Sequence, residues 1–217
     1  PSNNILDVDL EITIEDRSHL ELAKIQASDI QTDDWFGEAV SISGDYIAVG
    51  ASAPGNDIGS MYIFKRNSDN TDDVTQIAKV QANDTDASNH FGFSVSMSGD
   101  YVAVGAFGED TTASDAGSVY IFKKNSDNTN DVTQIAKIQA SDAEASDWFG
   151  SSVSMNGDYI AVGSSQEDTN GIDAGSVYIF KRNSDNTNDV TQIGKIQASD
   201  AEAYDSFGGS VSMSGDY

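Results

Sequence analysis

Several aspartates stand in polar loops where they could bind a hard cation. Ca²⁺ takes about six to eight oxygen ligands, and these loops combine Asp with Asn and Ser. Asp110 with Asp115, and Asp142 with Asp147, could converge on one ion from neighbouring loops. Calcium is therefore the candidate cofactor, with the candidate ligands Asp110, Asp115, Asp142, Asp147, Asp168 and Asp173. The alternative is that each Asp caps a turn through its own backbone, because no loop has a known calcium-binding spacing.

Two tryptophans are candidate ligand-binding residues. Trp35 and Trp148 each precede a Phe-Gly pair, at a position where His90 and Ser206 stand in other copies of the same motif. An aromatic ring exposed on a protein surface can stack on a sugar ring, which would make a lectin-like site. The alternative is that these rings pack between repeated units and have a structural role.

The residues give little support for catalysis. The only histidines, His19 and His90, occupy unrelated positions, and the chain has no cysteine. No glycine-rich phosphate loop is present. Paired carboxylates occur in every repeat, which suits a scaffold better than a single active site. The sequence therefore predicts a protein that is not an enzyme.

The charge of the chain excludes two classes of partner. The net charge is −25, with 28 Asp against 8 Glu. Such a surface repels nucleic acid and anionic membranes, and no apolar run is long enough to insert into a bilayer. The acidic residues form either a solvated surface suited to a salty medium or a set of divalent-cation sites.

One stretch of sequence recurs at a nearly fixed period. Phe-Gly pairs begin at residues 36, 91, 149 and 207, in steps of 55, 58 and 58 residues. A chain of this kind is a repeat protein, whose units pack mainly on their neighbours. We expect Phe to fill the gap between units and Gly to permit a tight turn. The motif residues are Phe36, Gly37, Phe91, Gly92, Phe149, Gly150, Phe207 and Gly208.

Each repeat predicts four short antiparallel strands, which is typical of a β-propeller blade. Alternating apolar residues, tight Gly-Asp turns and two polar loops separate the four pieces, and no helical period is sustained. The predicted fold is all-β: a β-propeller of four-stranded blades of 55–58 residues. The predicted complete blades are 36–82, 91–140 and 149–198, with partial blades at 20–29 and 207–217. Residues 1–19 lie outside the repeat and contain a predicted strand at Ile5–Ile14.

The loops divide between two sides of such a fold. Because the strands alternate in direction, loops that lead into first strands share a side with loops between second and third strands. This side collects acidic residues with almost no compensating base. The other side carries most of the cations, in pairs such as Lys65-Arg66 and Lys123-Lys124. We expect the two sides to differ in charge.

The repeated stretches resemble the FG-GAP repeat. The resemblance rests on Phe-Gly followed by residues 94–106, on Gly-Ser-Val-Tyr-Ile-Phe at 117–122, and on residues 133–142. It covers about residues 20–217 and implies a propeller like that of integrin α-subunits, usually of seven blades, in an extracytoplasmic binding or adhesion protein. The integrin-type calcium loop is not matched, because Ser-Gly-Asp or Asn-Gly-Asp is too short to wrap a cation.

Three complete blades are too few to close a ring, which typically needs about four to eight. The two ends of the chain either form a composite fourth blade or belong to a longer protein, and the stop at Tyr217 within the motif favours the latter. The predicted function is a non-catalytic extracellular binding and adhesion module that uses its face loops. Its partner would be a protein or a glycan at the cell surface or matrix. The alternatives are a surface or filament protein that self-associates through open blade edges and, less favoured, an enzyme on a propeller scaffold.

Overall fold

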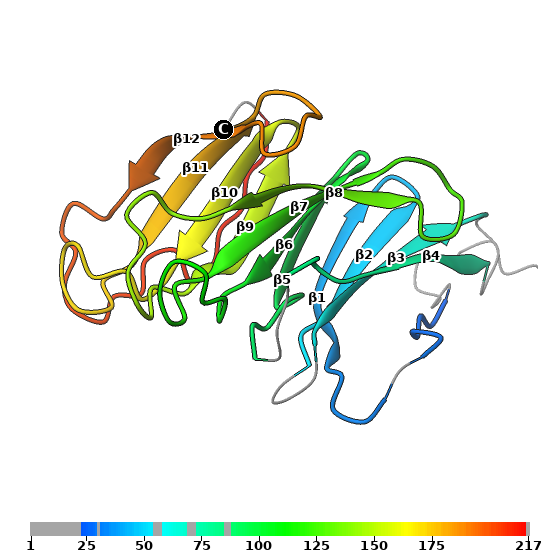
Figure 1. Cartoon of the computed structure of the whole chain (residues 1–217), viewed down its shortest axis with the longest axis horizontal. Coiled ribbons are helices and arrows are strands. Elements are labelled where there is room, and N and C mark those ends of the chain that lie inside the picture. The colour runs from blue at the N-terminus through cyan, green and yellow to red at the C-terminus, as the bar shows by residue number, and fades with distance from the viewer. Residues whose placement is uncertain (1–22, 30, 54–57, 69–72, 85–87, 216–217) are drawn as a thin grey trace, which may run out of the picture.

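The computed structural model describes residues 23–29, 31–53, 58–68, 73–84 and 88–215, so the strand predicted at Ile5–Ile14 lies outside the described residues. These ranges contain three antiparallel four-stranded sheets and no helix (Figure 1). Blade 1 consists of β1 (Phe36–Ser43), β2 (Tyr46–Ala51), β3 (Ser60–Arg66) and β4 (Val74–Val80). Blade 2 consists of β5 (Ser94–Ser98), β6 (Tyr101–Ala106), β7 (Ser118–Lys124) and β8 (Val132–Ile138). Blade 3 consists of β9 (Phe149–Asn156), β10 (Tyr159–Ser164), β11 (Ser176–Arg182) and β12 (Val190–Ile196).

The strands pair in chain order in each sheet, which confirms the predicted all-β fold of propeller-like blades. In blade 2, the alternation of β5 places Val95 opposite Val104 and Met97 opposite Val102 on one face. Gly99 makes the turn between these strands with a φ of 59°, a left-handed conformation that favours glycine. Within the described ranges, no helix is long and apolar enough to cross a bilayer.

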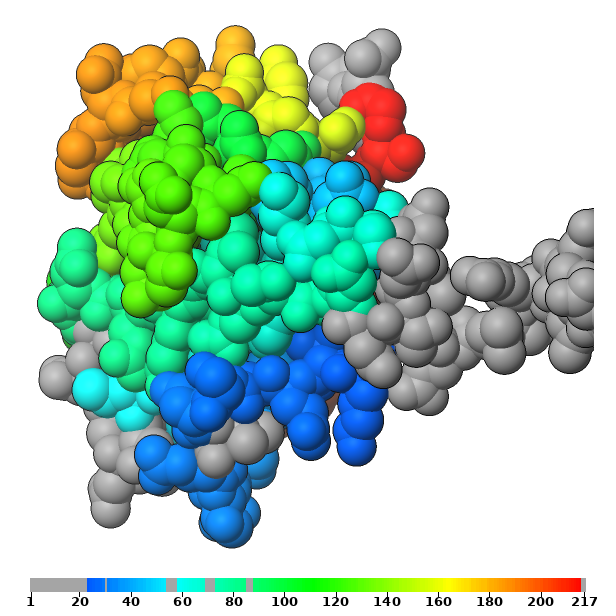
Figure 2. All heavy atoms as spheres, turned by 90° about the vertical axis from the view of Figure 1, so that its right-hand side faces the viewer, coloured from blue at the N-terminus to red at the C-terminus, as the bar shows by residue number. Residues whose placement is uncertain are grey.

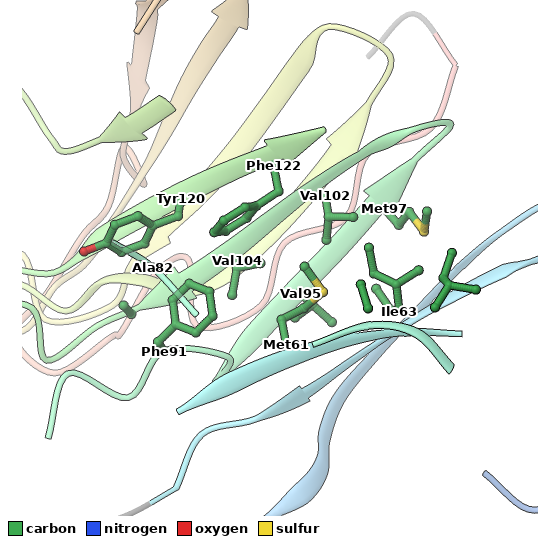
Figure 3. Packing of buried hydrophobic residues seen from close by; sticks show 14 residues of the cluster. Met61, Ile63, Ala82, Phe91, Val95, Met97, Val102, Val104, Tyr120 and Phe122 are labelled. Carbon is green, nitrogen blue, oxygen red and sulfur yellow. The ribbon is translucent and has the colours of Figure 1, made fainter. Parts of the chain in front are cut away.

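Neighbouring blades pack face to face through buried hydrophobic side chains (Figure 3). Met61 and Ile63 of β3 face Phe91, Val95 and Phe122 of blade 2, and all five side chains are buried. A buried side chain of this size contributes about 1.5–3 kcal/mol to folding. The same packing recurs between blades 2 and 3, through Val119, Ile121, Phe149, Val153, Tyr178 and Phe180.

The Phe-Gly motif joins each blade to the one before it. Phe91 stacks edge-on against Tyr120 and Phe122 of its own blade, at ring distances of 5.5 and 5.9 Å. Gly92 has a φ of 95°, and a Cβ added there would lie 2.5 Å from the carbonyl oxygen of Ser60 in blade 1. At Gly37, where the structure describes no preceding blade, an added Cβ would meet nothing within 4 Å. In blade 2 the glycine of the motif thus lies against the backbone of the preceding blade, and the phenylalanine is buried against two aromatic rings of its own blade.

The short turns and the loops between third and fourth strands lock the blades together on one side. The hydroxyl of Tyr46 donates to Asp127 of the next blade at 2.7 Å, and Lys65 forms an ion pair with the same carboxylate at 2.6 Å. Tyr101 and Lys123 hold Asp185 of blade 3 in the same way. These contacts give the near-identical loop sequences on this side a packing role.

Blade 1 leaves part of its outer face open. Val40 and Ile42 of β1 are 56% and 67% exposed, whereas the corresponding Val95 and Met97 are 8% and 5% exposed beneath blade 1. Residues 23–29 cover only another part of this face, where Ala27 packs against Val49 and neighbouring side chains. Figure 2 views the molecule from this end, with residues 23–29 in blue.

Blade 3 is also partly open on its far side. Residues 207–215 run along it where the next first strand would lie: Phe207 forms a bridge with Gly175, and the Met213 amide donates to Ser154 at 2.9 Å. They form no strand ladder within the described part of the chain. Ile193 and Ile196 of β12 remain about half exposed.

Candidate functional site

The loops before the first strands and those between second and third strands lie on one side of the molecule. Hydrogen bonds join them directly: the Ser146 amide donates to the Ser114 carbonyl at 2.8 Å, and the Phe149 amide donates to the Ala116 carbonyl at 3.0 Å. Their sequences differ between blades, so we call this side the variable face. The side with the Tyr–Asp and Lys–Asp contacts is the repeated face.

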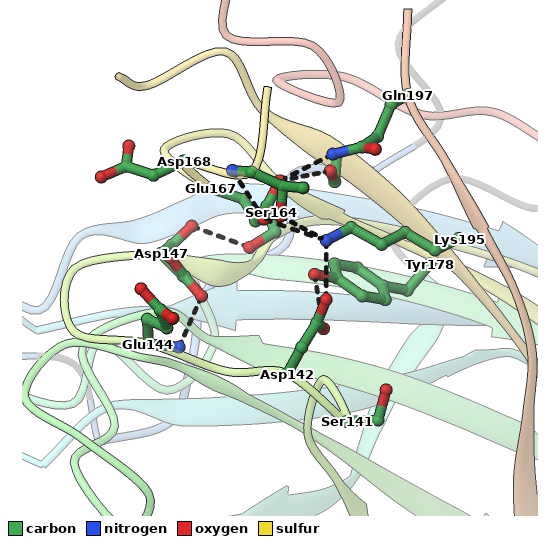
Figure 4. A network of polar contacts seen from close by, with 12 residues as sticks. Ser141, Asp142, Glu144, Asp147, Ser164, Glu167, Asp168, Tyr178, Lys195 and Gln197 are labelled. Atoms are coloured by element: carbon green, nitrogen blue, oxygen red, sulfur yellow. Dashed lines mark hydrogen bonds and ion pairs between the residues drawn. The ribbon is translucent and has the colours of Figure 1, made fainter. Parts of the chain in front are cut away.

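A partly buried lysine–carboxylate network, in which Glu167 and Tyr178 are buried and Asp142 is exposed, lies beneath the variable face in blade 3 (Figure 4). Lys195 of β12 forms ion pairs with Asp142 at 2.7 Å and with Glu167 at 2.9 Å. The hydroxyl of Tyr178, which lies opposite Lys195 in the sheet, donates to Asp142 at 2.9 Å. Gln197 donates to Glu167 at 3.1 Å. The network ties two loops to the two outer strands of the blade.

Glu167 is ionised although it is buried. Burial alone would raise its pKa, but hydrogen bonds from Ser176, Thr169 and Lys195 outweigh that effect and lower the pKa to about 2. A buried carboxylate stays charged when several donors satisfy its lone pairs. The charge is therefore part of the folded structure.

Blade 2 repeats this network, and blade 1 has part of it. Lys137 forms ion pairs with Asp84 at 2.7 Å and with Glu109 at 3.0 Å. In blade 1, Lys79 forms an ion pair with Asp29 at 2.5 Å. The expectation that the acidic side has almost no compensating base is thus wrong, because the fourth strand of each blade turns a lysine toward it.

These lysines and the glutamates that they bind were not among the candidate residues predicted from the sequence. The signal was present: Lys79, Lys137 and Lys195 occupy the same place in three copies of Thr-Gln-Ile-(Ala/Gly)-Lys. A charged side chain among the apolar residues of a strand indicates a buried or half-buried partner. Finding the partner requires the packing of one blade on the next.

The six candidate calcium ligands have protein partners or line one cavity. The Asp115 amide donates to the Asp110 carboxylate at 2.7 Å, and the Asp173 amide donates to the Asp168 carboxylate at the same distance. This is the turn-capping arrangement of the alternative hypothesis. The structure brings three of the six candidates, Asp142, Asp147 and Asp168, to the same cavity of about 140 Å³, where Asp142 also binds Lys195. In the described part of the chain, no group of three or more acidic or histidine side chains could hold a metal ion.

Calcium binding stays a prediction that stability can test. Since Asp142 already binds Lys195 and Asp110 and Asp168 cap their loops, an ion would have to displace existing contacts. We expect the melting temperature to stay within about 1 °C up to millimolar Ca²⁺, because only a ligand that binds the folded state raises it. A concentration-dependent rise, absent with Mg²⁺, would support the calcium hypothesis instead.

Burial destabilises the ionised form of the Asp147 carboxylate. Burial is the main cause that raises its pKa, and the nearby charges of Glu167, Glu144 and Asp168 add to it, so that the pKa is about 6. The Glu144 amide donates to it at 2.7 Å and opposes the rise. The ionised form of Asp147 is therefore destabilised relative to that of a free aspartate, although it still predominates at neutral pH.

D147N is expected to stabilise the protein above pH 6. The folded pKa lies above the unfolded value, so the folded state binds the extra proton between about pH 4 and 6, and wild-type stability falls as the pH rises through this range. Asparagine stands naturally at the corresponding Asn89. Urea unfolding should show a gain of about 2–3 kcal/mol at pH 7.5, at about 1.4 kcal/mol per pKa unit, and this gain should disappear below about pH 4. A gain of equal size at both pH values would contradict this explanation.

The two candidate tryptophans have different surroundings. Trp148 is half-buried and packs against Phe107 of blade 2 at 5.1 Å between ring centroids, which is a contact between blades. Trp35 is 49% exposed. Both have left-handed backbones, as do His90 and Ser206, with φ between 50° and 57°. The backbone is thus the same at four positions that carry three kinds of side chain.

A family model for the FG-GAP repeat matches residues 20–64, 74–122, 132–180 and 190–217. The second and third matches start at the fourth strand of one blade and end in the third strand of the next, so each spans the junction between two blades. No curated protein matches the chain. The matched stretches cover most of the sequence, and the chain belongs to the FG-GAP repeat family.

Proposed function

We propose that this chain is a non-catalytic, extracellular binding and adhesion module whose variable face binds a protein or glycan partner. The observation that carries the proposal is the contrast between the two faces. On the repeated face, Asp127 and Asp185 occur in near-identical loops that lock blades together. On the variable face, the same backbone presents Trp35, His90 or Trp148.

A constant framework with variable loops suits recognition. Binding residues are often found on loops that a rigid scaffold positions. Here the loops are held by hydrogen bonds between neighbouring blades, such as Ser146 to Ser114 and Trp148 to Asp115. A loop held in one conformation loses less entropy when it binds. The extracellular setting is the one that the FG-GAP resemblance implies.

The test compares the two faces. A random peptide library and a glycan array would be screened against the wild-type chain, and each hit measured against two variants. We expect binding to be lost in W35A on the variable face and retained in D185N on the repeated face. Hits that are lost in D185N but not in W35A would contradict the proposal, provided that both variants unfold cooperatively.

A second candidate function is self-assembly into a surface structure or filament. It is favoured by the exposed apolar residues at opposite ends of the blade stack, Val40 and Ile42 on blade 1 and Ile193 and Ile196 on blade 3. Packing of one end on the other would be head-to-tail, which builds open filaments. Light scattering would show concentration-dependent oligomers that V40T/I42T abolishes; a monomer at high concentration would exclude this function for the segment.

A further inference from the structure

The corresponding lysines of the three blades differ in the number of carboxylates with which they form ion pairs. Lys137 and Lys195 each hold two carboxylates, one from the preceding loop and one from a buried glutamate. Lys79 occupies the same cross-strand position, opposite Tyr62, and has one ion pair among the described residues, with Asp29. Blade 1 therefore has a lysine of the same kind with half of the carboxylate contacts.

The sequence explains the difference. The glutamates follow β6 and β10 in Ala-Phe-Gly-Glu and Ser-Ser-Gln-Glu, whereas blade 1 has Ala-Ser-Ala-Pro, with Pro54 at the glutamate position. The loop that connects the second and third strands has 8 residues in blade 1 (52–59) and 11 in blade 2 (107–117). The shorter loop of blade 1 carries no glutamate.

Blade 1 nevertheless keeps the donors that bind the glutamate elsewhere. In blade 2, the Glu109 carboxylate accepts hydrogen bonds from Ser118 at 2.7 Å and Gln139 at 3.2 Å, and from Lys137. The corresponding residues of blade 1, Ser60, Lys79 and Gln81, line a pocket of about 320 Å³. The other lining residues are Gln31, Asp34, Ala51, Ala53, Ile58 and Tyr62.

The polar side chains of Ser60 and Gln81 in this pocket have fixed positions, but the hydrogen bonds that Gln81 donates are to neutral acceptors. Ser60 is 4% exposed. The Gln81 amide donates to Ser60 at 3.2 Å and to the carbonyls of Ile58 and Gly59 at 3.3 and 3.4 Å. The two bonds to carbonyl oxygens are longer than the usual N–H···O range, and a carboxylate would offer a charge-assisted acceptor in place of neutral ones.

We propose that the blade 1 pocket binds a glutamate side chain of a partner protein, in the place that Glu109 and Glu167 occupy in their own blades. The internal glutamates also show the preferred sequence. Thr111, two residues after Glu109, donates both its amide, at 3.0 Å, and its hydroxyl to the same carboxylate oxygen. Thr169 does the same for Glu167. The partner segment is therefore of the type Glu-x-Thr.

The charges around the pocket permit one more carboxylate. Lys195 accommodates Asp142 and Glu167 with Asp147 nearby, and blade 1 offers Lys79, Asp29 and Asp34 at the same positions. Asp34 is thus the counterpart of Asp147 and opposes an incoming anion. Replacing Asp34 with asparagine, the residue found at position 89, should strengthen binding.

The inference rests on the proposed binding function, and its test uses a defined probe. The peptide acetyl-Gly-Glu-Asp-Thr-amide, which copies residues 108–111, is titrated into the ¹⁵N-labelled chain while NMR follows the Gln81 side-chain amide and the backbone amide of Lys79. We expect saturable shifts with Kd in the millimolar range, a gain of about threefold in affinity for D34N, and no binding for K79M. The Gly-Gln-Asp-Thr peptide should not bind, and K137M, its matched control in blade 2, should leave binding unchanged.

A loop exchange tests the pocket without a partner. Replacing residues 52–59 with residues 107–117 brings a glutamate into blade 1, and we expect a higher melting temperature and loss of peptide binding. A graft that folds and still binds the peptide overturns the proposal. So does a shift of the Lys79 signals in D57N without peptide, because Asp57 would then be the internal occupant. If the peptide fails while library hits still depend on Trp35, the carboxylate pocket is refuted and the binding function remains.

Discussion

Replacing Gly105 with alanine is expected to lower the free energy of unfolding by about 4 kcal/mol or more, the range of severe single substitutions. Gly105 follows Val104 near the end of β6, and it lies directly against the Phe-Gly motif of blade 3. An added Cβ would overlap the carbonyl oxygen of Gly150 and the hydroxyl of Ser94. Backbone cannot move aside as a flexible side chain can, so the blades would have to separate.

The matched control is G194A. Gly194 stands in β12 where the other blades have Ala78 and Ala136, and the nearest atom to an added Cβ is Ile179 Cβ at 3.8 Å. Alanine there should stabilise the protein by about 0.5–1 kcal/mol through lower entropy of the unfolded chain. Both variants are compared by denaturant unfolding. Equal effects of G105A and G194A would show that the close approach of the blades does not exist.

The architecture was predictable because its causes are local or periodic. Alternation in Ser-Val-Ser-Met-Ser predicts β5, and Gly99 predicts the turn that follows it. The repeat of Phe-Gly predicts packing between units, which Gly92 and Ser60 confirm. The locks on the repeated face were not predictable in the same way. Tyr46 and Asp127 are 81 residues apart, and only the stacking of whole blades brings them together.

The candidate site was harder to predict because its chemistry is divided among three segments. Lys195 meets Glu167 at a sequence separation of 28 residues and Asp142 at 53. Each contact depends on the register of β11 and β12 and on how the following loop folds back. The aspartate pairs that were candidate calcium ligands lie close together in the sequence, and Asp110 and Asp168 cap their own loops. Proximity in sequence indicated turn structure rather than a shared ligand.

Replacing Lys195 with methionine should destabilise the protein by about 3 kcal/mol at neutral pH. Methionine keeps much of the lysine side chain's length but removes the charge, which leaves Glu167 buried without its cation. Removing one partner of a buried pair typically costs about 3–5 kcal/mol, and the partial exposure of Lys195 reduces this. Urea unfolding at pH 7 measures the effect.

The matched control is K79M. Lys79 binds Asp29, which is nearly half exposed, and among the described residues no glutamate forms an ion pair with it. An exposed ion pair contributes about 0–1 kcal/mol, so K79M should cost much less than K195M. If the two variants lose the same stability, the buried glutamate is not what makes the lysine important.

The pH dependence of K195M separates an electrostatic role from loss of packing. In the wild type, the folded pKa of Glu167, about 2, lies below the unfolded value of about 4.3. Its stabilisation is therefore present above about pH 4.3 and is lost as the pH falls toward 2. Loss of Lys195 removes one of the interactions that lower the pKa of Glu167, so the carboxyl group of the variant takes up its proton at a higher pH than that of the wild type, and this protonation reduces the cost of the missing cation. The stability difference between wild type and K195M should shrink between pH 7 and pH 3, whereas a packing defect would keep it constant.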